Sequence, residues 1–97
     1  MRMEEFEWDP EKALANRAKH GVAFEEAATV FSDWGELTYP DGWHSTSEDR
    51  FITIAVSDSG RLLAVSHTDR GEKIRIISAR MATPGEMRAY EEKNRSG

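Results

Sequence analysis

The chain has 97 residues, of which 38% are hydrophobic and none is cysteine, and its formal net charge at pH 7 is −5. This length predicts one domain over residues 1–97, and the missing cysteines exclude disulfides, thiolate metal ligands and a cysteine nucleophile. The first residues lack the apolar core of a signal peptide and no segment has the roughly 18 apolar residues of a membrane span, so we expect a cytoplasmic protein without membrane contact.

The net charge is divided unequally along the chain. Residues 1–49 contain four Lys/Arg and twelve Asp/Glu, a net charge of −8, whereas residues 50–97 contain nine and six, a net charge of +3. A basic site for an anionic ligand is therefore compatible with the overall acidity. The alternative, that these charges only solvate the surface, stays open from charge alone.

The chain is expected to begin with a short strand and a helix. Acidic and bulky residues alternate over residues 4–8, as in a strand. Asp9 is a helix N-cap and Pro10 suits the first helical position, because a proline there loses no needed N–H donor. The helix should end at about residues 19–20, where Gly21 supplies a left-handed C-terminal residue.

A second helix is predicted from an apolar face with helical spacing, formed by Phe24, Ala27, Ala28 and Phe31. Ala23 precedes this helix and has no side-chain oxygen with which to cap it. The helix therefore has a weak start signal and a clear buried face.

The second half of the chain predicts a sheet. Strands are expected over residues 37–39, 50–57, 61–68 and 72–79. The turns at residues 58–60 and 69–71 are too short for crossover connections, so the last three strands should form an antiparallel meander.

A capping box at Thr83 and Glu86 starts a C-terminal helix that carries Met87 and Tyr90 on one side. The expected order is N-terminal strand, two helices, antiparallel sheet meander, C-terminal helix. This is an α+β domain.

The hairpin over residues 67–80 is the strongest candidate site. A histidine, His67, precedes two arginines, and Arg75 alternates out of phase with its apolar neighbours, while Arg80 stands at the strand end, where the alternation can lapse. A histidine near guanidinium groups suits RNA cleavage without a metal: His67 would transfer a proton and the arginines would stabilise a pentacoordinate phosphorane. Solvated arginines and a histidine bonded to a carbonyl are the structural alternative.

Other polar residues are weaker candidates. Lys19 and His20 suit phosphate contact or proton transfer, or simply compensate a helix dipole. Trp43-His44 could stack on a base, and Tyr90 could stack or donate a proton, or pack in the core. The three histidines have no metal-ligand spacing, so we expect no metal site and no cofactor.

Motifs spread over residues 6–92 resemble the BrnT toxins. They are Phe6-Glu-Trp-Asp-Pro10, Lys12, Asn16, Lys19-His-Gly-Val22, Phe24-Glu-Glu-Ala27, Phe31, His67-Thr68, Ile74-Arg-Ile-Ile-Ser-Ala-Arg80, Glu86 and Tyr90. The resemblance implies a RelE-like fold and a ribonuclease that arrests translation within a bacterial type II toxin–antitoxin system. It also implies a BrnA-type ribbon-helix-helix antitoxin, two toxins bound to two antitoxins, and operator DNA contacted only through the antitoxin.

The resemblance also carries over to residues. It points to Arg75 and Arg80 for phosphate, with His67 as their catalytic companion. The residues expected to bind RNA are Lys19, His20, Arg50, Lys73 and Tyr90. A non-catalytic module that only binds the antitoxin and co-represses the operon is the alternative, whereas direct DNA reading is disfavoured because no helix carries a basic face.

Overall fold

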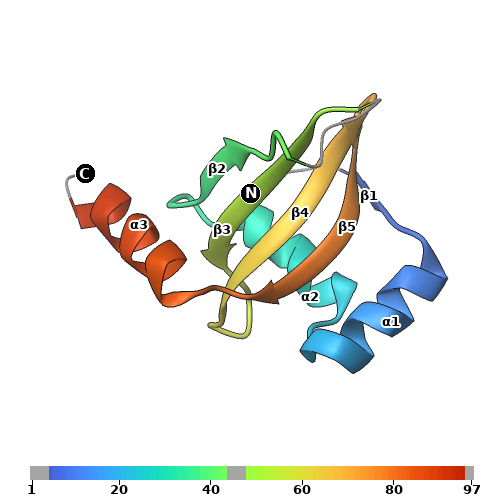
Figure 1. Cartoon of the computed structure of the whole chain (residues 1–97), viewed down its shortest axis with the longest axis horizontal. Coiled ribbons are helices and arrows are strands. Elements are labelled where there is room, and N and C mark those ends of the chain that lie inside the picture. The colour runs from blue at the N-terminus through green and yellow to red at the C-terminus, as the bar shows by residue number, and fades with distance from the viewer. Residues whose placement is uncertain (1–4, 44–47, 96–97) are drawn as a thin grey trace.

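The computed structural model describes residues 5–43 and 48–95 and shows one five-stranded sheet with three α-helices (Figure 1). In chain order the elements are β1 (Glu5–Glu7), α1 (Pro10–His20), α2 (Phe24–Thr29), the 3-10 helix η1 (Val30–Ser32), β2 (Leu37–Pro40), β3 (Arg50–Val56), β4 (Leu62–Arg70), β5 (Lys73–Met81) and α3 (Pro84–Arg95). The strand order across the sheet is β1-β5-β4-β3-β2. The expected α+β class is confirmed.

The sheet is mixed, so the prediction of an antiparallel sheet was incomplete. β3, β4 and β5 form the expected antiparallel meander and β2 adds to β3, but β1 pairs with β5 in parallel. The pairing sets Phe6 beside Ile74, and both side chains pack on the core. A short turn determines the pairing only of the two strands that it joins. Two helices separate β1 from the rest of the sheet, so no turn determines its partner.

The helix boundaries follow local capping chemistry. Asp9 Oδ1 accepts a hydrogen bond of 2.9 Å from the backbone N–H of Glu11, and Gly21 closes α1 with a φ of 70°. Ala23 makes no side-chain cap, and α2 contains only six residues before the chain tightens into η1. The expected second helix is therefore divided, although Phe31 remains buried as predicted.

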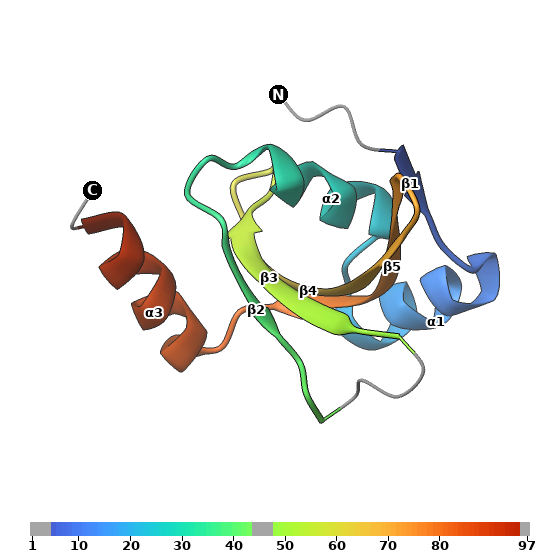
Figure 2. The same cartoon turned by 90° about the horizontal axis from the view of Figure 1, so that it is seen from above.

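The core lies between α1, α2 and one face of the sheet, and Figure 2 shows α2 against that face. Its members are Val22, Phe24, Ala27, Val30, Phe31, Ala55, Leu63, Val65, Ile74, Ile76 and Ala79. One polar residue joins these layers: Asn16 Nδ2 donates to the carbonyls of Val22 (3.0 Å) and Ala79 (2.9 Å). Asn16 Oδ1 also accepts from the N–H of Ala79 at 3.0 Å, which fixes α1 to β5.

The β4–β5 hairpin turns later than expected. Arg70 pairs with Lys73, so the turn consists of Gly71 and Glu72 and not of residues 69–71. Gly71 has a φ of 62°, and a two-residue hairpin loop needs a positive φ at its first position. Both strands are consequently longer than the sequence pattern suggested.

Candidate functional site

A row of polar residues crosses the sheet on the face opposite α1 and α2. Residues paired across neighbouring strands point to the same face. The register aligns Arg50 of β3, Thr68 of β4, Arg75 of β5 and Glu7 of β1. Thr68 is buried at 1% exposure between the two arginines. The sheet face opposite α2 is the one turned toward the viewer in Figure 1.

Arg80 shares this face with Arg75 because β5 contains a bulge. Residues 66 and 67 of β4 pair with residues 78 and 76 of β5, so Ile77 has no residue opposite it. An extra residue reverses the alternation of side chains beyond it. The two arginines, five positions apart, therefore point the same way, and we call the surface of Arg50, Arg75 and Arg80 the arginine face.

Most cations on or beside the arginine face have a carboxylate partner. The pairs are Arg75 Nη1–Glu7 Oε2 at 2.8 Å, Arg80 Nη1–Glu86 Oε1 at 2.7 Å, Arg80 Nη2–Glu86 Oε2 at 3.0 Å, Arg70 Nε–Glu48 Oε2 at 3.0 Å and Lys73 Nζ–Glu5 Oε2 at 4.0 Å. These carboxylates hold the guanidinium groups in position but also neutralise part of their charge. An incoming phosphate has to share or replace a carboxylate.

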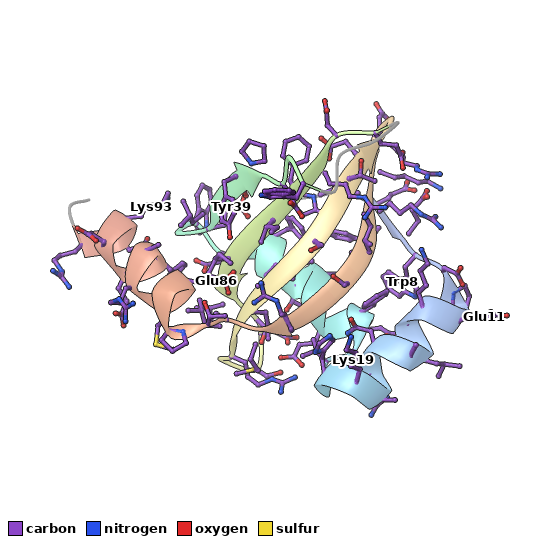
Figure 3. All side chains as sticks on the ribbon, viewed as in Figure 1. Trp8, Glu11, Lys19, Tyr39, Glu86 and Lys93 are labelled. Atoms are coloured by element: carbon purple, nitrogen blue, oxygen red, sulfur yellow. The ribbon has the colours of Figure 1, made fainter. Side chains whose placement is uncertain are left out.

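Glu86 connects the arginine face to the start of α3. Its Oε1 accepts from the N–H of Thr83 at 2.9 Å, and Thr83 Oγ1 accepts from the N–H of Glu86 at 3.2 Å, as the predicted capping box requires. Tyr39 Oη donates to Glu86 Oε2 at 3.4 Å, and Figure 3 shows these two side chains close together. The guanidinium of Arg80 holds the pKa of Glu86 at about 2, and the carboxylate in turn raises the pKa of Arg80.

This ion pair predicts acid-sensitive stability. The pKa of Glu86 is lowered from 4.5 to about 2, so its contribution to folding is complete above pH 4.5 and disappears as the pH falls toward 2. Glu86→Gln should therefore reduce the loss of stability between pH 6 and pH 3, measured by urea unfolding. Glu91→Gln, an exposed change on the same helix, is the control and should leave the pH dependence unchanged. Equal acid sensitivity in the Glu86 variant and the wild type would contradict the coupling.

The structure separates His67 from the two arginines, which corrects the grouping expected from sequence. His67 pairs with Ile76 and lies on the helix-covered face, at 5% exposure. Its Nε2 forms a hydrogen bond of 2.8 Å with Thr53 Oγ1, and its ring contacts Phe31 edge-on and stacks on Phe51. The sheet therefore lies between His67 and the arginine face.

The remaining predicted site residues are dispersed. Arg50 lies on the arginine face, and Lys73 flanks it at the hairpin. Lys19 and His20 are at the C-terminal end of α1. Figure 3 shows Lys19 on the side of the molecule away from Tyr39 and Glu86. His44 lies outside the described residues.

Tyr90 fastens α3 to the connection between η1 and β2. Its hydroxyl donates to Asp33 Oδ2 at 2.6 Å, and burial together with this bond raises the pKa of Tyr90 to about 12. Asp33 Oδ2 also accepts from the N–H of Val56 at 2.9 Å. The sequence suggested RNA contact or core packing for Tyr90, but not this hydrogen bond to Asp33.

Sequence reasoning missed the acidic partners of the arginines. Glu7 reaches Arg75 only because β1 is parallel to β5, a pairing that no local pattern indicated. Glu86 was identified as a capping residue, and its spacing of six residues from Arg80 gave no signal of an ion pair. Tyr39 likewise has no motif that marks it.

Two absences apply to residues 5–43 and 48–95. No three His, Asp or Glu side chains in this part of the chain are grouped so that they could hold a metal ion. The helices described there are too short and too polar to cross a membrane.

The fold is that of a small α+β protein with three arginines on the face of the sheet opposite α1 and α2. Comparison with known families identifies it further, because a family model described as "Ribonuclease toxin, BrnT, of type II toxin-antitoxin system" matches residues 8–86. The chain belongs to this family of BrnT ribonuclease toxins.

A solved structure supports the same fold. The crystal structure of the Brucella abortus ribonuclease toxin BrnT, at 1.1 Å resolution, matches with a TM-score of 0.65 and 23% sequence identity. The match covers 84% of this chain and 99% of that chain. No curated protein matches the chain.

Proposed function

We propose that this chain is a RelE-like, metal-independent endoribonuclease that arrests translation, and that the arginine face is its RNA-binding surface. The observation that carries the proposal is the bulge in β5, which brings Arg80 to the same face as Arg50 and Arg75. Three guanidinium groups on one face suit successive phosphates of an RNA strand, because each offers a fork of N–H donors to anionic oxygens. Lys73, beside this face at the hairpin, adds a further cation for the RNA backbone.

The reaction uses the 2′-hydroxyl of the RNA as nucleophile, water for proton transfer and a charged surface. The 2′-oxygen of a nucleotide attacks the neighbouring phosphorus, the bond to the 5′-oxygen breaks, and the products are a 2′,3′-cyclic phosphate and a free 5′-hydroxyl. Water accepts the proton of the 2′-hydroxyl and supplies one to the departing 5′-oxygen. Arg75 and Arg80 would act by stabilising the additional negative charge on the non-bridging oxygens in the transition state.

The proposed partner is a BrnA-type ribbon-helix-helix antitoxin, assembled as two toxins with two antitoxins. Its support is the family itself, whose description names a type II toxin–antitoxin system. The charge of −8 over residues 1–49 suits contact with basic residues of such a partner. Operator DNA would be contacted through the antitoxin, and the complex would repress its own operon in the cytoplasm.

One observation favours a second candidate function, a non-catalytic module that only binds the antitoxin. Carboxylates pair with four cations on or beside the arginine face, namely Arg70, Lys73, Arg75 and Arg80. His67 is buried on the other face. A surface neutralised in this way could serve protein contact without RNA chemistry.

Purified protein distinguishes the two functions. We expect it to cleave single-stranded RNA in the presence of EDTA and to leave 2′,3′-cyclic phosphate ends, detected by their resistance to ligation until the phosphate is removed. Expression of the chain alone should stop growth, and co-expression of the antitoxin should restore it. Intact RNA together with normal growth would favour the non-catalytic module.

A further inference from the structure

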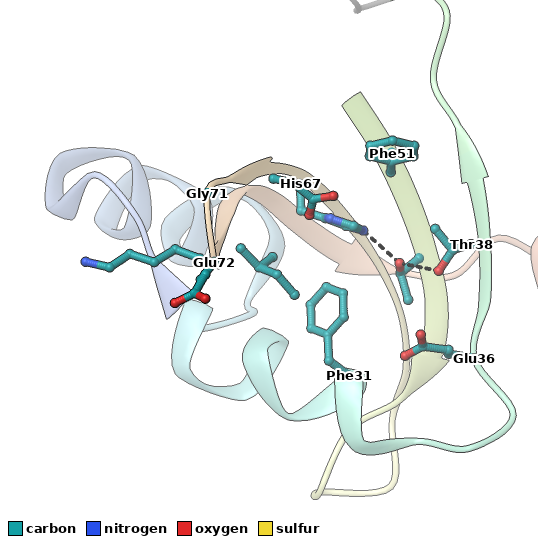
Figure 4. Close-up of a pocket in the computed structure, with 11 residues that line it drawn as sticks. Phe31, Glu36, Thr38, Phe51, His67, Gly71 and Glu72 are labelled. Carbon is teal, nitrogen blue, oxygen red and sulfur yellow. Dashed lines mark hydrogen bonds between the residues drawn. The ribbon is translucent and has the colours of Figure 1, made fainter. Parts of the chain in front are cut away.

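A pocket of about 440 Å³ opens on the helix-side face of the sheet, beyond the end of η1 (Figure 4). It extends from the β4–β5 hairpin at Gly71 and Glu72, across His67, to Thr38 on β2. Its volume is within the usual range for small-ligand sites. Nothing in the proposed chemistry of the arginine face uses it.

The floor of the pocket combines aromatic rings with a fixed chain of polar groups. Phe31 and Phe51 line it on either side of His67, with ring centroids 4.9 Å and 5.9 Å from the imidazole. His67 Nε2 is 2.8 Å from Thr53 Oγ1, which is 2.7 Å from Thr38 Oγ1 (Figure 4). Flat apolar rings beside ordered hydroxyls suit a planar ligand that is aromatic and polar at its edge.

The charged residues of the pocket set a second condition. Glu36, Asp69 and Glu72 line it, against one cation, Lys73. Three carboxylates repel a phosphate from the interior, but their oxygens accept hydrogen bonds from amino and imino groups. The ligand must therefore present N–H donors and keep its phosphate outside.

We propose that this pocket binds one base of the RNA substrate and selects bases that carry amino groups, with guanine preferred. Guanine offers adjacent N1–H and N2–H donors that one carboxylate accepts together, whereas uracil offers one N–H flanked by two carbonyl oxygens that the carboxylates repel. The inference rests on the proposed ribonuclease function and adds a specificity site to it.

The position of the pocket permits this role. Its lining includes Lys73, which pairs with Arg70 across the hairpin, so two cations lie next to the carboxylates at this end of the pocket. An RNA strand held on the arginine face could continue over the tip of the β4–β5 hairpin. One phosphate would then lie at Lys73 and Arg70, and the next base would turn into the pocket. A single-stranded RNA has unstacked bases that can turn in this way.

Nucleotide titration tests the site without depending on activity. With isotope-labelled wild-type protein, GMP should shift the amide signals of Phe51, Thr53 and Gly71, and UMP, of equal phosphate charge, should bind at least tenfold more weakly. Phe51→Leu removes the aromatic face and Asp69→Asn removes a carboxylate, and each should weaken GMP binding at least tenfold. Leu14→Ala, on an exposed side chain of α1 outside the pocket, is the control and should bind GMP as the wild type does.

A cleavage assay then connects the pocket to specificity. Sequenced fragment ends should show a guanine bias at a fixed distance from the cut, and Phe51→Leu should lower cleavage at the guanine sites to the level of the other sites. Cleavage with no base bias in the wild type, or equal affinity for GMP and UMP, would overturn the inference. Weaker antitoxin binding by the two variants without any nucleotide binding would also overturn it and give the pocket to the protein partner. GMP binding at these residues without ribonuclease activity would refute the proposed function and leave the base site standing.

Discussion

Arg80→Gln is expected to lower the rate of RNA cleavage by about 100-fold or more, the usual effect of removing one charged donor from a transition state. The variant should remain folded, because Glu86 keeps its capping bonds with Thr83 and the side chain of Arg80 is partly exposed, so that water can solvate the carboxylate that loses its partner. The measurement is the initial cleavage rate on a defined RNA, with urea unfolding of the same preparation as the folding check. Arg75→Gln should act in the same direction.

The control for these variants is Arg88→Gln, which removes the same charge from an exposed position on α3. It should cleave RNA at the wild-type rate, so that a loss at Arg80 cannot be attributed to net charge. If Arg80→Gln stayed fully active and toxic, the arginine face would not be the catalytic surface. Restoration of activity by Arg80→Lys would show that charge alone, and not the planar fork, is required.

Asn16→Ala is expected to lower the free energy of unfolding by about 3 kcal/mol. Its amide makes three buried hydrogen bonds, and truncation leaves the N–H and carbonyl of Ala79 and the carbonyl of Val22 without this partner, at about 1–3 kcal/mol for each unsatisfied group. Urea denaturation at neutral pH measures the change.

Asn94 provides a matched control for that substitution. Its Nδ2 also donates to two carbonyls, those of Gly35 at 3.0 Å and Tyr90 at 2.8 Å, but in an exposed setting where water can replace the bonds. Asn94→Ala should therefore cost under about 1 kcal/mol. Equal costs at the two positions would mean that burial of the Asn16 amide does not determine its contribution.

Local chemistry predicted the ends of the first and last helices and the strands of the meander. Asp9, Gly21 and the Thr83–Glu86 box mark helix ends through bonds within a few residues, and the structure contains those bonds. The β-meander could also be predicted from the local sequence, since its turns are short. The predictions hold where the interactions that decide a feature lie close together in sequence.

The candidate site depends on features that a local pattern does not contain. Whether Arg75 and Arg80 share a face depends on the unpaired Ile77, and alternation alone leaves this undecided because a bulge is defined by the partner strand. The face on which His67 lies is also determined by the partner strand: His67 pairs with Ile76 and so shares its buried face. The sequence pattern therefore grouped His67 with Arg75 and Arg80, whereas the structure places it on the opposite face of the sheet.

The short strand β1 has a consequence for the order of folding. Glu7 and Arg75 are 68 positions apart, and β1 contributes only three residues to the edge of the sheet. Joining such distant segments is entropically slow, whereas the hairpins of the meander close locally. A chain emerging from the ribosome would thus form its arginine-bearing hairpin before Glu7 can dock against it. The carboxylate that restrains Arg75 is also expected to be among the first groups released when the edge of the native sheet opens.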